Sequence, residues 1–312
     1  MSLEIAILET LAYSDIFDFP LTIDELHRFL VQPASLQDLE QCATGMKDVD
    51  RRDGYFYLRG REEIVEIRKH RQGASRKVFK RGIIYGRMFA VLPFIRMVAL
   101  TGSLTMLNLS KDSDIDFMLV AAHGYVWTAR AFAVLLGRVT RLFGDTLCPN
   151  LIVSERALEW PSHDLYSARE FCQMVPIAGK DVYLRLLSTN SWMKAFLPNA
   201  NPIWDREVSQ KKESRFDIFG SMFRTKISLQ FESWEMKRKI ARFSRQAGFG
   251  EETVFTADVC QGNFDHHRKW TEEAYKDRLS SVGLQFEVWE QAPTVVENEL
   301  SRPKVNSANA TD

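Results

Sequence analysis

The sequence predicts an α+β protein with an N-terminal unit of three helices and a hairpin, a central α/β segment and a helical C-terminal region. Three observations lead to this fold class. Helix-start signals and an Asp-Gly turn lie close together near the N-terminus, apolar strands alternate with a helix in residues 93–155, and charged helical patterns occupy residues 215–284. Strands that alternate with helices are typical of an α/β unit.

Residues 1–60 carry the start signals of short helices. Apolar residues recur at helical spacing from the start, Thr22 precedes a glutamate by three positions in a capping-box pattern, and Ser35 precedes a further helical segment. The pair Asp53-Gly54 beside an aromatic strand is a strong hairpin signal. Three helices followed by a hairpin are the order of a winged helix, so we expect a winged-helix-like domain here.

Residues 61–92 form a basic stretch that is predicted to be a linker helix. Such a stretch either binds nucleic acid or forms a solvated helix face. A DNA-reading helix normally brings Arg, Lys, Asn or Gln to bases and phosphates, yet the third helical segment carries Asp38 and Glu40 and lacks Arg and Lys. Nucleic acid is therefore a less favoured partner, and we expect the N-terminal domain to be an interaction or substrate-covering module.

Residues 93–196 are predicted to form the central α/β domain. Strands and one helix alternate in its first part, with strands expected at 94–102, 115–122 and 150–155 and the helix at 125–144. Its second part, residues 165–196, is predicted to be helical with a break at Pro176 and Gly179. Helices are expected in the C-terminal region, residues 197–300, and the polar tail 301–312 is expected to be disordered.

The composition is that of an ordinary globular protein and excludes several classes. Of 312 residues, 45% are hydrophobic and 26% are charged, and the formal net charge is zero, so no global attraction to nucleic acid or anionic membrane is expected. The four cysteines form no Cys-x-x-Cys pair, which argues against a zinc ribbon or a dense disulfide scaffold. The most apolar stretch, residues 88–100, is interrupted by Pro93 and Arg96. We expect a cytoplasmic protein with no membrane partner.

Acidic residues stand at the start of an otherwise apolar strand in the segment "KDSDIDFMLV", which begins at Lys111. Asp112 precedes Asp114 and Asp116, and the last two point to the same face because side chains alternate along a strand. Two unit charges at ~4 Å repel by about 4 kcal/mol at an effective dielectric constant near 20. A shared divalent cation offsets such repulsion, and oxygen-rich clusters suit Mg²⁺.

A glycine-serine pair, Gly102-Ser103, follows the preceding strand. Glycine lets the backbone approach a phosphate closely, and free N–H groups at a helix start favour an anion. "TGS" followed by "DSDIDFMLV" resembles the nucleotidyltransferase signature of the DNA polymerase β-like superfamily. The signature covers about 20 residues, or residues 95–155 with its flanking elements, and the whole chain is similar to bacterial nucleotidyltransferase-domain proteins.

The resemblance implies a nucleotidyltransferase domain with a mixed sheet. It also implies that Gly102, Ser103 and Ser113 bind a nucleoside triphosphate, which is the substrate. Asp114 and Asp116 would hold Mg²⁺, with Mn²⁺ as an alternative. Lys111 could neutralise developing charge, although a solvated loop lysine is the simpler interpretation.

The sequence departs from the family pattern at the third carboxylate. Asn150 stands where the resemblance implies an acidic residue that activates the acceptor hydroxyl, and an amide cannot act as a general base. Glu155 and Glu159 are alternative candidates for this third carboxylate. The first hypothesis is a Mg²⁺-dependent enzyme that transfers a nucleoside monophosphate to an unidentified hydroxyl acceptor. The second is a catalytically weakened binding or regulatory protein of the same fold. The sequence says nothing about oligomeric state.

Overall fold

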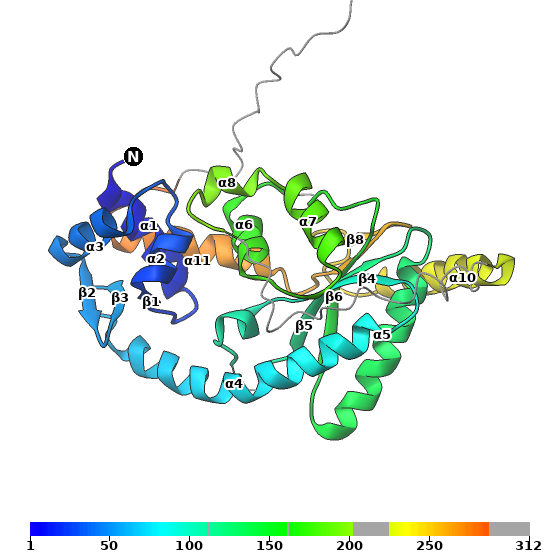
Figure 1. Cartoon of the computed structure of the whole chain (residues 1–312). Coiled ribbons are helices and arrows are strands. Elements are labelled where there is room, and N and C mark those ends of the chain that lie inside the picture. The colour runs from blue at the N-terminus through cyan, green and yellow to red at the C-terminus, as the bar shows by residue number, and fades with distance from the viewer. Residues whose placement is uncertain (111–112, 161, 202–224, 287–312) are drawn as a thin grey trace, which may run out of the picture.

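The computed structural model describes residues 1–110, 113–160, 162–201 and 225–286. It is an α+β structure, as predicted, with a three-stranded antiparallel sheet and a six-stranded mixed sheet (Figure 1). The predicted disordered tail at 301–312 lies outside the described residues. No helix in the described ranges combines the length and the apolar character that a membrane span requires.

The N-terminal unit contains the three predicted helices and the predicted hairpin. Its elements are α1 (Leu3–Asp15), β1 (Leu21–Thr22), α2 (Ile23–Phe29), α3 (Leu36–Gly45), β2 (Val49–Arg52) and β3 (Tyr55–Leu58). Thr22 forms the predicted capping box with Glu25, and Ser35 caps α3. Asp53 and Gly54 have φ values of 53° and 83°, as a type I′ turn requires.

Helix α4 (Glu63–Ala90) is a single continuous helix that connects the two sheets along one side of the molecule (Figure 1). Several of its cations form ion pairs within the chain. Arg68 contacts Glu25 at 2.7 Å, and Arg81 donates to Asp145 at 2.7 Å. These two basic groups are therefore paired with carboxylates of the protein itself.

The six-stranded sheet has the order β7-β4-β5-β6-β9-β8. Strand β5 pairs antiparallel with β4 and parallel with β6. The strands are β4 (Ile95–Leu100), β5 (Ile115–Ala121), β6 (Leu147–Ser154), β7 (Val175–Ala178), β8 (Thr253–Phe255) and β9 (Val259–Gly262).

Helices cover both faces of this sheet. Ile115, Phe117 and Leu119 pack toward α4 and α5 (Val126–Thr140), whereas Met118 and Val120 pack toward α6 (Leu165–Gln173) and α7 (Lys180–Thr189). The α6 side shares one apolar core with the N-terminal unit. Residues that alternate along β5 thus enter different cores, and Asp116 lies on the face of Met118 and Val120.

Two parts of the chain predicted to be helical contain strands. The break at Pro176 is strand β7, which pairs with β4 at the edge of the sheet, where a proline that lacks an N–H is tolerated. In the C-terminal region, β8 and β9 lie between α10 (Lys226–Phe243) and α11 (His267–Ser281), and β9 pairs with β6. The helical prediction was wrong there, because β9 covers an edge of β6 that would otherwise be exposed.

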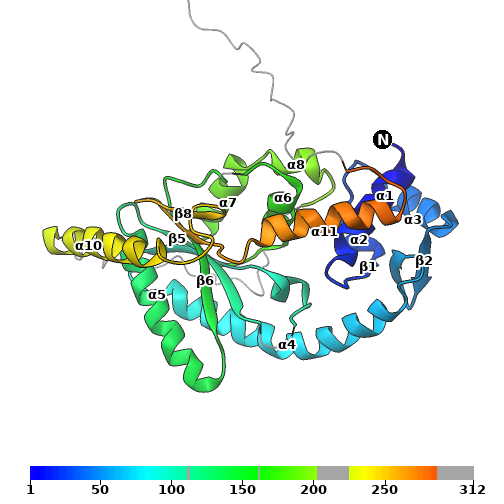
Figure 2. The same cartoon turned by 180° about the vertical axis from the view of Figure 1, so that it is seen from behind.

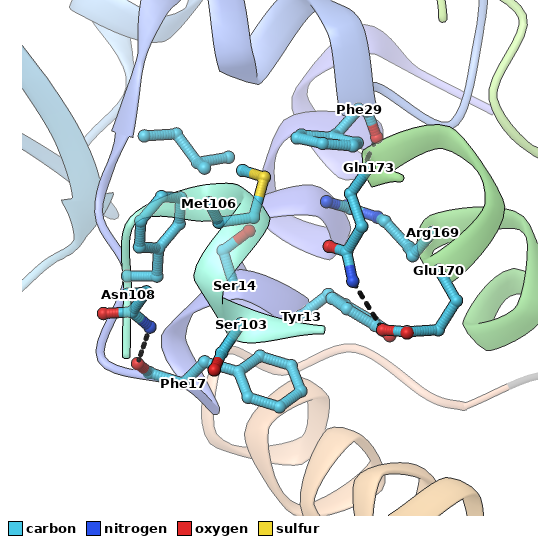
Figure 3. Close-up of a pocket in the computed structure, with 12 residues that line it drawn as sticks. Tyr13, Ser14, Phe17, Phe29, Ser103, Met106, Asn108, Arg169, Glu170 and Gln173 are labelled. Carbon is cyan, nitrogen blue, oxygen red and sulfur yellow. Dashed lines mark hydrogen bonds between the residues drawn. The ribbon is translucent and has the colours of Figure 1, made fainter. Parts of the chain in front are cut away.

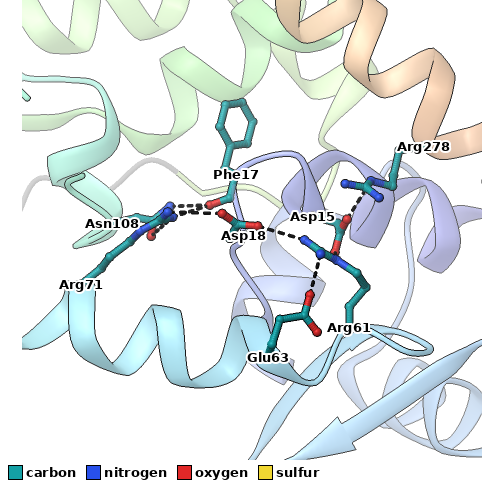
Figure 4. Close-up of polar contacts among 8 residues, drawn as sticks. All are labelled: Asp15, Phe17, Asp18, Arg61, Glu63, Arg71, Asn108 and Arg278. Atoms are coloured by element: carbon teal, nitrogen blue, oxygen red, sulfur yellow. Dashed lines mark hydrogen bonds and ion pairs between the residues drawn. The ribbon is translucent and has the colours of Figure 1, made fainter. Parts of the chain in front are cut away.

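The C-terminal helix α11 returns to the N-terminal unit and packs against α1 (Figure 2). Asp15 of α1 is buried and contacts both Arg61 at 3.0 Å and Arg278 of α11 at 2.7 Å (Figure 4). The carbonyl of Phe17 accepts hydrogen bonds from Arg71 of α4 at 2.9 Å and from Asn108 at 3.0 Å. These contacts join the N-terminal unit to the segment that follows the Gly-Ser pair.

Candidate nucleotide and metal site

The Gly-Ser pair and the acidic strand meet at one end of the central sheet. Leu100 of β4 pairs with Phe117 of β5, and the next N–H, that of Thr101, donates to the Asp116 carbonyl at 3.0 Å. Gly102 follows with a φ of 70°, and a Cβ atom placed on it would lie 2.6 Å from Oδ2 of Asp116. The position therefore requires glycine for its backbone angle and for the close approach of the carboxylate.

Ser103 begins a short 3₁₀ helix, η1 (Ser103–Met106), directly after Gly102. The carbonyl of Gly102 accepts a hydrogen bond from the N–H of Thr105 at 3.1 Å, which turns the chain away from the sheet. Ser113, the third predicted nucleotide-binding residue, precedes Asp114, and its hydroxyl lies 2.5 Å from that of Ser110. Lys111 and Asp112 lie outside the described residues.

Asp114 and Asp116 interact electrostatically, as the alternation predicts. Asp114 is exposed just before β5, whereas Asp116 is half-buried within it. Burial and the charge of Asp114 raise the pKa of Asp116 to about 7, although the thiol of Cys148 donates a hydrogen bond to its carboxylate. Burial also raises the pKa of Asp114, against the opposing charge of Arg141. Burial and, for Asp116, the neighbouring charge thus disfavour the ionised carboxylates, and a bound cation would favour them.

The carboxylates of Asp114 and Asp116 fit a hard divalent cation whose coordination shell is completed by another ligand. Within the described residues no group of three His, Cys, Asp or Glu side chains is arranged to hold a metal ion. The two aspartates offer carboxylate oxygens, which Mg²⁺ and Mn²⁺ accept, and Mg²⁺ is often bound by one or two carboxylates together with substrate phosphates. We therefore expect metal to bind weakly unless a nucleotide supplies further oxygens.

Asn150 lies close to the site but not directly opposite Asp116. In the parallel pairing of β5 with β6, Asp116 is opposite Cys148, and the register shifts so that Met118 is opposite Leu151. Asn150 is the extra residue at this irregularity, is exposed, and borders a cavity of about 200 Å³ with Thr101 and Met118. Its assignment to the third-carboxylate position remains a prediction.

The two alternative glutamates are less suitable. Glu155 follows the far end of β6, where it accepts a hydrogen bond from the N–H of His123 at 3.3 Å. Its N–H donates to Ala121, five residues along β5 from Asp116, which corresponds to about 16 Å at the rise of a strand. Glu159 is exposed outside the strands. Glu155 is therefore not placed to replace the third carboxylate.

The structure instead brings Glu170 of α6 to the site. Burial and the negative charge of Asp116 raise the pKa of Glu170 to about 7, and the Gln173 amide donates to its carboxylate at 2.5 Å. Glu170 borders both the cavity beside Asn150 and a second cavity that Ser103 lines. The sequence contains no signal for this residue, because it is one charge among others on an amphipathic helix.

No protein-family model, curated protein or solved structure matches this chain. The candidate site is therefore supported by its own residues and their geometry.

The raised pKa values of Asp116 and Glu170 predict a pH dependence of the metal-free protein. A carboxyl whose pKa is higher in the folded state than in the unfolded state stabilises the fold fully below the unfolded value, near 4. This contribution is lost as the pH rises through about 7, the folded value for both groups. We expect Asp116→Asn to raise the free energy of unfolding at pH 8 by about 1–2 kcal/mol, allowing for solvent screening.

Urea unfolding followed by circular dichroism at pH 8 and pH 5 measures this effect, which should shrink at the lower pH. Glu159→Gln, a change of an exposed carboxylate, is the control and should alter neither value by more than about 0.5 kcal/mol. An Asp116→Asn protein less stable than the wild type at both pH values would contradict the raised pKa of Asp116.

Proposed function

We propose that the protein is a Mg²⁺-dependent nucleotidyltransferase that moves a nucleoside monophosphate from a nucleoside triphosphate to a hydroxyl acceptor. The observation that carries the proposal is the contact between the two halves of the motif. Gly102 lies so close to the Asp116 carboxylate that a methyl group at Gly102 would overlap it. A phosphate group beside the Gly-Ser pair would thus be next to the carboxylates that accept the metal.

Each site residue has a separate task in this proposal. Gly102 and Ser103, with Ser113, orient the triphosphate through their backbone and hydroxyl groups. Asp114 and Asp116 hold the metal, which when bound neutralises charge on the phosphates. Glu170 receives the proton of the acceptor hydroxyl, because its raised pKa suits a general base near neutral pH. In this proposal Glu170 of helix α6 takes the role that the third carboxylate has in the nucleotidyltransferase family.

The proposed domain organisation follows from the same elements. The mixed sheet with β5 between an antiparallel and a parallel neighbour supports a nucleotidyltransferase domain. The three helices and the hairpin of residues 1–60 support a winged-helix-like module. Because this module shares a core with α6 and is joined to Asn108, we propose that it covers the substrate.

One observation favours the alternative of a weakened binding or regulatory protein. In the described part of the chain, no third acidic residue joins Asp114 and Asp116 as a metal ligand, and the residue that the resemblance would place at the third-carboxylate position is Asn150. Such a protein would bind nucleotide without transferring it. A screen of transfer from labelled nucleoside triphosphates to mixed hydroxyl acceptors separates the two functions.

Calorimetric titration with ATP and with GTP, each with Mg²⁺, tests nucleotide binding directly. We expect wild-type protein to bind one of them and the Asp114→Ala/Asp116→Ala variant to bind it at least about tenfold more weakly, a loss of about 1.4 kcal/mol. Glu159→Ala, on an exposed loop, is the matched control and should keep wild-type affinity. Equal affinity in the wild type and the double variant would refute the proposal.

A further inference from the structure

A second cavity opens between the N-terminal unit and the candidate site (Figure 3). Its volume is about 100 Å³. Four aromatic side chains of the N-terminal unit form its walls: Tyr13, Phe17, Phe19 and Phe29. Two residues of the candidate site, Ser103 and Glu170, also border it. An apolar chamber therefore adjoins the phosphate-binding segment and the proposed base.

Arg169 extends into this cavity from α6 (Figure 3). The side chain is only 4% exposed, and its guanidinium lies 4.6 Å from the ring centres of both Tyr13 and Phe29. Within the part of the chain that the structure describes, its one direct hydrogen bond goes from Nη2 to the Phe29 carbonyl at 3.3 Å. Among the described residues no carboxylate lies within 4 Å of it, and its Nε has no hydrogen-bond partner.

Arg68 is a comparably buried arginine that does have a carboxylate partner. It is the other buried arginine among the described residues, is likewise 4% exposed, and also contacts two aromatic rings. Both of its terminal nitrogens donate to the Glu25 carboxylate at 2.7 Å. A buried cation is costly unless it is paired with an anion. Arg169 lacks the anion that Arg68 has, although the aromatic faces partly compensate.

We propose that this cavity binds the acceptor, a small monocarboxylate with an aromatic or aliphatic body and a hydroxyl group. The guanidinium of Arg169 binds the carboxylate, and the ring of Phe17 contacts the apolar body, leaving the hydroxyl toward Ser103. Since a water-sized site needs about 10–15 Å³, the cavity holds roughly seven to ten such atoms, the size of a small hydroxy acid. A bidentate carboxylate matches the fork of a guanidinium.

The role as acceptor depends on the proposed nucleotidyl transfer, whereas the binding of the acid does not. In the transfer, the acceptor oxygen forms a bond to the α-phosphorus as the bond from that phosphorus to its bridging oxygen breaks. Pyrophosphate leaves, and the hydroxyl proton passes to Glu170. We expect the aromatic walls to limit the access of water to this region and thereby the hydrolysis of the triphosphate.

Calorimetric titration of the full chain with 4-hydroxybenzoate and with the neutral 4-hydroxybenzamide tests the cavity. We expect wild-type protein to bind the acid at least about tenfold more tightly than the amide, because only the acid pairs with Arg169. Arg169→Met, which keeps much of the side-chain length without the charge, should remove this preference. Met106→Trp fills the cavity without replacing Arg169 and should abolish binding of both compounds.

Circular dichroism checks that the Arg169→Met and Met106→Trp proteins are folded. If only one of them folds, that variant alone is enough to test the cavity. Equal affinity for acid and amide, an Arg169→Met protein with wild-type preference, or no binding of the acid would overturn the inference. The Asp114→Ala/Asp116→Ala protein should keep wild-type affinity for the acid. If the protein binds ATP with Mg²⁺ but not the acid, only the proposed binding of the acid in the cavity is refuted. If it binds the acid but not ATP with Mg²⁺, only the proposed nucleotidyltransferase function is refuted.

Discussion

Replacing Glu170 by glutamine is expected to slow nucleotidyl transfer by about 10²–10⁴-fold, the usual contribution of a positioned general base. The substitution keeps the shape and the hydrogen bond from Gln173 but removes the proton acceptor. Because Glu170 is not a metal ligand in this proposal, the affinity for nucleotide with Mg²⁺ should stay within about twofold, a difference of less than about 0.5 kcal/mol. Pyrophosphate release with the acceptor found by screening measures the rate, and calorimetry measures the affinity.

Asn150→Asp is the informative companion to this variant. If Asn150 occupies the third-carboxylate position, the aspartate adds an oxygen ligand, so affinity for Mg²⁺ or Mn²⁺ and any turnover should both rise. If Glu170 is the base, Asn150→Asp changes the rate little and does not rescue Glu170→Gln. If Glu170→Gln transfers nucleotide as fast as the wild type and Asn150→Asp transfers it faster, then the general base is supplied at position 150 of β6 and not by Glu170 of α6.

Gly102→Ala is expected to destabilise the protein by about 2–4 kcal/mol and to abolish binding of nucleotide with Mg²⁺. The positive φ of Gly102 is strained for alanine, and the new methyl group would lie 2.6 Å from Oδ2 of Asp116, so the carboxylate or the backbone must move. The energy range combines the cost for alanine of this backbone, with a φ of 70° and a ψ of −166°, with that of a steric overlap. Urea unfolding and calorimetric titration measure the two effects.

Gly45→Ala provides the matched control. Gly45 is the last residue of α3, does not have a positive φ, and has open space where the Cβ of an alanine would stand, with no neighbouring atom within 4 Å. Alanine there should leave nucleotide binding unchanged and alter stability by less than about 1 kcal/mol. A Gly102→Ala protein that matched this control in both measurements would show that the contact with Asp116 has no role in the site.

The local elements of the N-terminal unit were predictable because short-range interactions specify them. The capping box at Thr22, the cap at Ser35 and the Asp53-Gly54 turn each involve groups within three residues of one another. Strands β4 and β5 were predictable for a different reason. Both are buried on two faces, and such strands appear as continuous apolar runs.

The added strands could not be predicted, because their partners lie far away in the sequence. Strand β9 is four residues long and pairs with β6, more than a hundred residues earlier, and β7 contains a proline that would ordinarily argue against a strand. Segments this short contain too few residues for a period of two to stand out from a helical pattern. Their conformation follows from the exposed edges of the sheet that they cover.

For the candidate site, the sequence by itself determined the composition of the motif, Gly102-Ser103 followed by Asp114 and Asp116, because these residues lie at the end of β4 and the start of β5, which are consecutive strands. Only the tertiary structure decided what surrounds the motif. The packing of α6 on the sheet brings Glu170 within the electrostatic influence of Asp116, and the packing of α1 on α6 buries Arg169 among aromatic rings. Helix faces acquire their neighbours when the core forms, so neither residue differs in sequence from an ordinary surface charge.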